Sequence, residues 1–332
     1  MRPRLPTVPG PSPTARIARL ATAGVLLALT PCPPALAAGA PIVVAGEAQE
    51  ARAGTPLSRY IDTNARPAFE DRFATFDHGT DQAPPLQPHR WRTVYGYGGA
   101  FSMANRHMSS TSFGSDAAFA GLSADGSGPG PGTGPAPGPR PLGLDPFVHR
   151  PGLLTIMARR TPDSARLLAW NKPYYGGIIT TKFSFAQRYG YFEIDARLPV
   201  GKGMWPAFWL MPIDGAWPEA GEIDVFEGLG DPRSVYCTVI AGRTKVSRRI
   251  RLSFDASAGF HRYGVLWRPD VIVWFIDGRE VSRAATPPAL TRTSAYLIAN
   301  LAIGGAWGGF PDAKTVFPGR YAIRRISVWP LR

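Results

Sequence analysis

The chain has 332 residues, and its 37 lysines and arginines against 24 aspartates and glutamates give a formal net charge of +13. Hydrophobic residues make up 44% of it and charged residues 18%, a composition that excludes wholesale disorder. No apolar run reaches the roughly 18 residues of a membrane span, and the basic residues are scattered without a nucleic-acid-binding motif, so neither a membrane span nor a nucleic-acid partner is expected.

The first 37 residues have the three parts of a secretory signal peptide. Four arginines precede a short apolar stretch at 21–29, and Ala35-Leu36-Ala37 offers a small-residue cleavage site. We therefore expect a secreted or periplasmic protein. Cleavage leaves a net charge of +9 and removes Cys32, so that Cys237 remains alone. Since Cys237 stands in a strand-like run, we expect it to be a small buried hydrophobic residue.

Residues 38–65 are mixed and weakly patterned, and we expect them to form an N-terminal arm. Residues 66–332 are expected to form one domain. Within it, the segment 123–141 (SADGSGPGPGTGPAPGPRP) is low-complexity Gly and Pro sequence. Such sequence cannot form a packed element, so we interpret it as a loop inserted between early strands.

Short β-rich runs bounded by turn residues follow one another along the chain. They lie at 69–76, 153–159, 177–186, 191–198, 207–211, 222–227, 235–240, 261–267, 271–276, 296–302 and 321–329. Asp277-Gly278 separates VIVWFI from REVSRA and predicts a tight β-hairpin there. Amphipathic helical patterns are absent from the sequence, so the fold class is all-β, a sandwich or a barrel.

Three acids lie within six residues of an otherwise apolar strand, in GEIDVFE at 221–227. Because strand side chains alternate between faces, Glu222 and Asp224 share a face and Glu227 takes the other. One extra residue, a β-bulge near Val225 or Phe226, would bring all three acids to one face. Such a row suits cleavage of a glycosidic bond, which needs one ionised and one protonated carboxyl group. A solvated charged strand and a cation site are the alternatives, although these acids alone do not supply the six or so oxygens that calcium needs.

Tryptophans stand close to these acids in the sequence. Trp205, Trp217 and Trp307 are flanked by Gly and Pro, which favours a place in a cleft where their rings can stack on sugars. Trp209 lies within the apolar run AFWLM, and we expect it to pack in the core.

Five motifs occur in order in the second half of the chain. They are GLLTIMA at 152–158, GGIITTKFSFAQRYGYFEIDARLPVGKGMWPAFWLMP at 176–212, GEIDVFE at 221–227, FHRYGVLWRPDVIVWFIDG at 260–278 and NLAIGGAWGGFPD at 300–312. Together they resemble glycoside hydrolase family 16, the laminarinase- and lichenase-like β-glucanases. The resemblance implies a β-jelly-roll sandwich of two antiparallel sheets, whose concave face holds a polysaccharide.

The resemblance also implies roles for residues. Glu222 matches the nucleophile of a retaining glycosidase, Glu227 the acid/base, and Asp224 the helper between them. Glu193 and Asn300 match substrate-binding positions, together with the three cleft tryptophans, Trp205, Trp217 and Trp307. No cofactor or catalytic metal is expected. A structural calcium ion is implied by the resemblance alone, with no ligands that the sequence can place.

We expect the chain to be a monomer. Its expected partner is a polysaccharide substrate. The bulged spacing of the acids resembles the laminarinase branch and favours β-1,3-glucan, while the basic chain would also suit an acidic bacterial exopolysaccharide. Asp195, Ile240 and Leu266 stand where the family often has Arg, His and Glu. Two alternatives to a hydrolase stay open: a transglycosylase, and a non-catalytic polysaccharide-binding protein on the same fold.

Overall fold

The structure is a computed structural model that describes the backbone of Gln49–Glu50 and residues 54–79, 89–95, 106–120 and 141–331. The predicted signal peptide at 1–37 and almost all of the Gly/Pro insertion at 123–141 lie outside the described residues. The residues that are described belong to one compact unit. None of their helices is long and apolar enough to cross a membrane.

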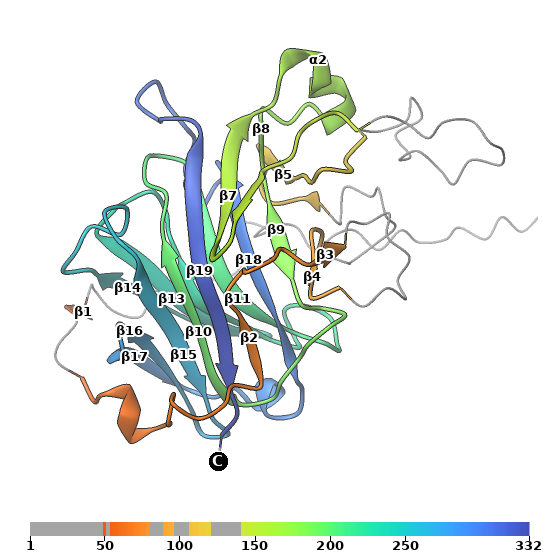
Figure 1. The fold of residues 1–332 in the computed structure, drawn as a ribbon. Helices are drawn as coiled ribbons and strands as arrows, with labels where there is room; N and C mark the ends of the chain where they lie inside the picture. Colours follow the sequence, from red (N-terminus) through yellow and green to blue (C-terminus); the bar gives the residue numbers. More distant parts are fainter. Residues whose placement is uncertain (1–48, 51–53, 80–88, 96–105, 121–140, 332) are drawn as a thin grey trace, which may run out of the picture. The chain divides into compact units, whose positions relative to one another are not determined.

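Two β-sheets face each other, as the sequence predicts for an all-β sandwich (Figure 1). In the described residues the first sheet has the order β1 (Gln49–Glu50), β14 (Thr244–Arg251), β13 (Ser234–Ala241), β12 (Glu222–Glu227), β11 (Met204–Pro212), β18 (Ala295–Ile303), β9 (Ile178–Thr180), β4 (Trp91–Arg92) and β3 (His78–Gly79). The long central strands of this sheet pair antiparallel, and the parallel pairs β1–β14 and β3–β4 lie at its two ends.

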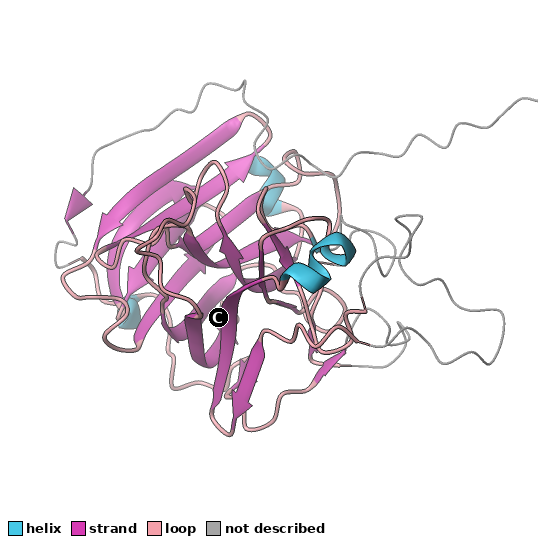
Figure 2. Cartoon of the chain, turned by 90° about the horizontal axis from the view of Figure 1, so that it is seen from above, coloured by secondary structure: helices cyan, strands magenta, loops and turns pink. Residues whose placement is uncertain are grey.

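The second sheet has the order β17 (Arg279–Ala285), β16 (Val271–Ile276), β15 (His261–Trp267), β10 (Gly190–Arg197), β19 (Gly319–Trp329), β7 (Leu153–Arg160), β8 (Tyr174–Gly176) and β5 (Ser112–Gly114). Beside this path, β2 (Phe69–Asp71) pairs with β19, and β6 (Phe147–Arg150) pairs with β7. The described helical segments are short and lie outside the strands (Figure 2): η1 (Leu57–Arg59), α2 (Asp163–Arg166), η2 (Leu167–Ala169) and η3 (Pro288–Thr291).

The main core lies between the sheets because alternate residues of each central strand turn inward. Phe192 and Ile194 of β10 meet Phe208 and Leu210 of β11 in this core. All nine residues of β18 are buried, since a second apolar cluster covers its outer face. A strand covered on both faces reads as a continuous apolar run, as β18 does.

Most predicted strands are confirmed, and β12, β15 and β16 have the predicted bounds. The predicted hairpin at Asp277-Gly278 has positive φ at both residues, +49° and +74°, as a tight type I′ turn requires. The run 69–76 was expected to be a strand throughout, but β2 ends at Asp71, where the carboxylate accepts the Phe73 N–H at 2.7 Å and turns the chain. The run at 177–186 is strand only over β9. The sequence did not predict β14.

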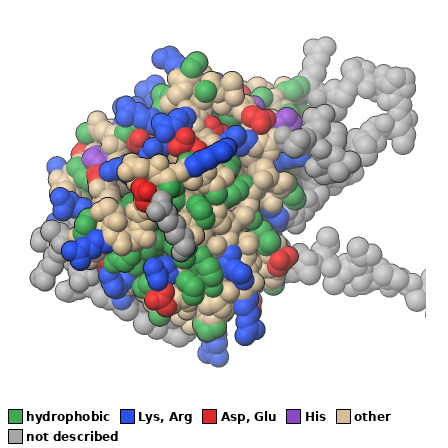
Figure 3. Space-filling view, turned by 60° about the horizontal axis from the view of Figure 1, so that its bottom comes forward, with side chains coloured by type: hydrophobic (Ala, Val, Ile, Leu, Met, Phe, Trp, Pro, Cys, Tyr) green, Lys and Arg blue, Asp and Glu red, His purple; other side chains and the backbone are tan. Residues whose placement is uncertain are grey.

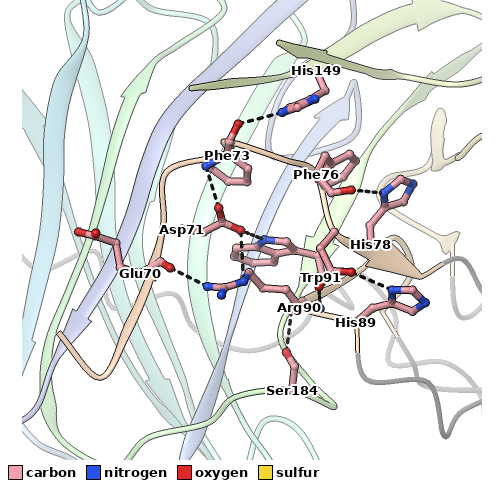
Figure 4. A network of polar contacts seen from close by, with 11 residues as sticks. Glu70, Asp71, Phe73, Phe76, His78, His89, Arg90, Trp91, His149 and Ser184 are labelled. Atoms are coloured by element: carbon pink, nitrogen blue, oxygen red, sulfur yellow. Dashed lines mark hydrogen bonds and ion pairs between the residues drawn. The ribbon is translucent and has the colours of Figure 1, made fainter. Parts of the chain in front are cut away.

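A polar network fastens the early strands to the sandwich (Figure 4). Asp71 on β2, in the second sheet, accepts the indole N–H of Trp91 on β4, in the first sheet, at 2.7 Å. Arg90 donates to the Glu70 carbonyl at 2.6 Å, and the Ser184 hydroxyl donates to the Arg90 carbonyl at 2.6 Å. These bonds tie β2 and β4 together across the edge of the two layers.

The described part of the N-terminal arm, from Gly54 onward, packs on the outer face of the second sheet. Leu57 and Ile61 join a cluster with residues of β10, β15, β16 and β19. The Leu57 N–H bonds the Gly278 carbonyl at 3.0 Å, and the Trp329 indole bonds the Ala65 carbonyl at 3.0 Å. The arm is therefore part of the packed structure there.

Basic side chains are spread over the face drawn in Figure 3, with acidic and hydrophobic side chains among them. This matches their scattered positions in the sequence. On that face the positive net charge is not gathered into one patch of the kind that binds nucleic acid.

Candidate active site

The three acids lie on β12, near the centre of the first sheet between β11 and β13. The pairing with β11 skips Val225, and the pairing with β13 shifts between Asp224 and Glu227. Val225 and Phe226 both pack in the core, which leaves Glu222, Asp224 and Glu227 on the opposite face. The predicted bulge is present, and it aligns the three carboxyl groups, which we call the acid row.

Tryptophan N–H groups hold the two outer members of the acid row. Trp217 donates to Glu222 Oε2 at 2.6 Å, and Trp205 donates to Glu227 Oε1 at 3.0 Å. Glu222 and Glu227 are partly exposed, whereas Asp224 between them is only 3% exposed. The two outer carboxyls are thus fixed in orientation and still accessible to a bound molecule.

The members of the acid row differ in their tendency to hold a proton. Burial, then the charges of Glu222 and Glu227, raise the pKa of Asp224 well above its usual range, and protonated Asp224 donates a hydrogen bond to Glu222. Burial also raises the pKa of Glu222, but the bonds from Asp224 and Trp217 oppose this rise. Burial and the charge of Glu222 raise the pKa of Glu227 to about 7. Because the charge of Glu222 helps to raise the pKa of Glu227, Glu222 is the first of these two to ionise and Glu227 holds its proton to higher pH.

Asn300 lies on the acid-bearing face, since it pairs with Ala207, which in turn pairs with Glu227. Its side-chain oxygen accepts the indole N–H of Trp209 at 2.9 Å. Trp209, expected to pack in the core, packs against an apolar cluster on the outer face of the first sheet and not between the two sheets. Its neighbours in β11 take the inward positions, so Trp209 turns to the acid-bearing face, where it is partly exposed.

Trp307 follows β18 in the Gly-rich loop, and it also reaches the acid-bearing face. Its ring meets Tyr236 edge to face, with ring centroids 5.1 Å apart. Tyr236 on β13 pairs directly with Glu227. The ammonium of Lys245 on β14 lies 5.5 Å from the centre of the Trp307 ring. The structure therefore brings Trp205, Trp217 and Trp307 to the same face as the acid row.

Glu193 does not reach this face. It lies on β10 in the second sheet and is 2% exposed. Its carboxylate accepts the Tyr191 hydroxyl at 2.9 Å and Arg325 at 2.8 Å. Since the core side of β10 is taken by Phe192 and Ile194, Glu193 points to the outer side of the second sheet. It is therefore outside the candidate site, and its contacts are structural.

Two buried residues that the sequence did not assign to the site, Trp274 and Cys237, support the acid row from the core side. Trp274 on β16 crosses the core and donates its indole N–H to the Asp224 carbonyl at 2.8 Å. The Cys237 thiol donates to the Val225 carbonyl at 3.4 Å. Cys237 is buried, as expected, and burial raises the pKa of its thiol. Two successive main-chain carbonyls at the bulge, those of Asp224 and Val225, thus each accept a hydrogen bond from a buried side chain.

In the part of the chain that the structure describes, no group of three or more His, Cys, Asp or Glu side chains has the arrangement of a metal site. The implied calcium ion stays a prediction. The acid row places Glu222, which ionises first, and Glu227, whose pKa is raised to about 7, on one accessible face. Such a pair can attack an electrophilic carbon and protonate the group that leaves it.

Known proteins are similar to this chain in both sequence and architecture. It is 42% identical over 170 residues to the Endo-1,3-1,4-beta-glycanase ExsH of Rhizobium meliloti, and 43% identical over 169 residues to the Endo-1,3-1,4-beta-glycanase EglC of the same organism. The matches cover 50% and 49% of this chain, but only 36% and 35% of those two relatives. The chain thus spans about a third of their length.

Among solved structures, the laminarinase catalytic domain from Thermotoga maritima superposes with a TM-score of 0.60 at 26% identity. The superposition covers 80% of this chain and 98% of that domain, so the likeness extends over the whole sandwich. The family model described as "Glycosyl hydrolases family 16" matches residues 154–323, which carry the acid row, Trp205, Trp217 and Trp307. The chain belongs to glycosyl hydrolases family 16.

Proposed function

We propose that this chain is a retaining endo-glycosidase that hydrolyses β-1,3- or β-1,3-1,4-linked glucan at the acid row. The observation that carries the proposal is the alignment of three carboxyl groups by the β-bulge on one accessible face, with indole donors on Glu222 and Glu227, in a chain of family 16. Retention requires one of two nearby carboxyl groups to be ionised while the other is protonated, and the raised pKa of Glu227 suits it to hold the proton.

In this proposal Glu222 attacks the anomeric carbon, and Glu227 gives its proton to the oxygen of the leaving sugar. Glu227, now a carboxylate, then takes a proton from a water molecule, and that water releases the sugar from Glu222. Asp224 supports the nucleophile through its hydrogen bond to Glu222. The indole N–H groups of Trp217 and Trp205 keep the two reacting carboxyls oriented during both steps.

The proposed substrate follows from what the similar proteins are called. The first two relatives are named endo-1,3-1,4-beta-glycanases, and the superposed domain is a laminarinase. An acidic bacterial exopolysaccharide is the second candidate, because the chain is strongly basic. We also propose that the chain acts in the periplasm or outside the cell, on the strength of the sequence at 1–37.

The test is release of reducing ends from a panel of β-1,3-, mixed-linkage and β-1,4-glucans, agar and an acidic exopolysaccharide, with Glu222→Gln beside the wild type. We expect release by the wild type on β-1,3- or mixed-linkage glucan and a loss of at least about 10³-fold in the variant, which keeps its fold and its sugar binding. Hydrolysis by Glu222→Gln at the wild-type rate would remove the nucleophile assignment.

Two other outcomes would overturn hydrolysis itself. Products longer than the starting oligosaccharide, with few new reducing ends, would indicate a transglycosylase. Tight binding of one glucan without any turnover would indicate a binding protein, the function in the name of the 26% identical Beta-1,3-glucan-binding protein of Penaeus monodon.

A further inference from the structure

Lys245 is a basic residue on the acid-bearing face, and neither the sequence motifs nor the proposed reaction uses it. It lies on β14 and pairs with Ile240 of β13, which in turn pairs with Glu222. Cross-strand partners in this register share a face, so Lys245 and Glu222 point to the same side of the sheet. Lys245 therefore lies two strands away from Glu222, one of the two outer carboxyls of the acid row.

The Lys245 ammonium is held by an aromatic ring and not by an acid. It lies 5.5 Å from the centre of the Trp307 ring, a cation–π distance, and the Tyr236 ring supports Trp307 from the side. Within the described residues, no carboxylate lies at ion-pair distance from it. Arg249 and Arg251 are the other basic residues on this face of β14, and Arg249 is paired with Asp231 at 2.8 Å. Lys245 is thus a partly buried cation whose charge is not already neutralised by a close acid.

We propose that Lys245 is a positioning residue of this active site, the shared counter-ion for the single negative charge that the acid row carries through the reaction. This proposal rests on the proposed function. The groups that face Lys245 are the acid row on β12, Tyr236 on β13, the Trp307 ring, and Arg249 of β14 with its partner Asp231. Arg243 is exposed in the turn between β13 and β14.

The charge balance of the reaction explains why one cation suits this place. Before attack Glu222 is the carboxylate, and Glu227 holds the proton. As the Glu222 oxygen bonds to the anomeric carbon, the bond from that carbon to the leaving oxygen breaks, and the proton moves from Glu227 to that oxygen. The negative charge has then passed from Glu222 to Glu227. The charge of Lys245 favours the ionised form of every member of the acid row, so it stabilises both arrangements.

The experiment measures the pH dependence of kcat/KM for the wild type, Lys245→Met and Lys245→Arg on the glucan that the wild type cleaves best. Removing the cation makes both carboxyls harder to ionise. We therefore expect both limbs of the profile to move to higher pH in Lys245→Met, by about half a pH unit or more. Lys245→Arg keeps the charge and should restore the wild-type limbs. Lys245→Gln provides a second neutral variant if Lys245→Met does not fold.

Arg249→Met is the matched control, because it removes the same charge from the same face of the same strand. Arg249 also lies two strands from the acid row, across Tyr236 from Glu227, but its charge is paired with Asp231, so both limbs should stay in place. A Lys245→Met profile that coincides with the wild type would overturn the proposal. So would an equal shift in Arg249→Met, which would reduce the effect to net charge.

A titration that needs no turnover separates this proposal from the proposed function. The Glu227 carboxyl is followed by carbon-13 NMR in the wild type, Lys245→Met and Arg249→Met. We expect its midpoint, near 7 in the wild type, to rise in Lys245→Met alone. If the wild type cleaves no glucan, the proposed hydrolase fails, while the midpoint still decides whether Lys245 controls the acid row. An unchanged midpoint in an active enzyme overturns the Lys245 proposal and leaves the hydrolase standing.

Discussion

Glu222 and Glu227 are the same residue type five positions apart, both partly buried and both bonded by an indole N–H. What separates them is the third acid. Asp224 gives Glu222 a second hydrogen bond, whereas burial and the charge of Glu222 together raise the pKa of Glu227 to about 7. Pairs of carboxyls whose environments push their pKa values apart are what acid/base division requires. This arrangement has an energetic cost in the folded protein, since a buried carboxyl must ionise beside a negative charge.

Glu227→Gln should stabilise the fold at alkaline pH and leave it unchanged in acid. The folded pKa of Glu227, about 7, lies above its unfolded value of about 4.5. Its stabilising contribution is therefore complete below about pH 4.5 and is lost as pH rises through 7. Glutamine stays neutral throughout, so we expect the variant to gain about 1–3 kcal/mol over the wild type at pH 8.5 and nothing at pH 4.5. Urea unfolding at the two pH values measures this. An equal difference at both would contradict the raised pKa.

Strand β12 shows which structural features a local sequence pattern can predict. Alternation and the parity of Glu222, Asp224 and Glu227 are local properties, so they predicted the strand, its bounds and the bulge. The neighbouring β14 reads TKVSRRIR, and most of its residues keep some exposure, so it lacks the apolar alternation that marks a strand. For this reason Lys245 was not predicted to join the site. Trp274 could not be assigned either, because its bond to Asp224 joins residues fifty positions apart in two sheets.

The hydrogen bond from the Trp274 indole to the Asp224 carbonyl holds the main chain at the start of the bulge. Trp274→Phe keeps a buried aromatic ring but leaves the Asp224 carbonyl without its donor, so the bulge loses a fixed point. We expect kcat to fall about 10-fold or more with little change in KM, because small displacements of reacting groups cost rate before they cost binding.

Trp267→Phe is the control for this prediction. Trp267 is also buried in the core, but its indole nitrogen has no hydrogen-bond partner within the described structure. The substitution removes the same atoms without freeing a carbonyl at the acid row. Equal losses of kcat in the two variants would show that ring volume, and not the bond to Asp224, is what the active site needs.

In the molecule as a whole, the two sheets have different roles. The first sheet carries the acid row on its open face, while the second is covered on its outer face by the N-terminal arm. Strand spacing and turn residues are distributed along the chain and predicted an all-β sandwich or barrel, and the resemblance to family 16 favoured the two-sheet sandwich. The sequence did not predict on which side of a sheet a given residue lies. Glu193 was assigned to the substrate, but in the structure it bonds Tyr191 and Arg325 on the outer side of the second sheet. Which sheet a strand joins depends on contacts far apart in the sequence.

This division predicts that the arm contributes to stability and not to chemistry. Leu57 is 6% exposed and packs against β15 and β16 on the outer face of the second sheet. Leu57→Ala should cost about 2–3 kcal/mol of unfolding free energy, because it leaves a cavity under the arm. The core and the first sheet lie between that cavity and the acid row, so kcat and KM per folded molecule should not change. Leu167→Ala, at a residue 79% exposed, is the control and should alter neither quantity. If Leu57→Ala left the unfolding free energy intact, the arm would be a passive extension; if it lowered kcat in folded protein, the second sheet would have to transmit strain to the acid row through the core.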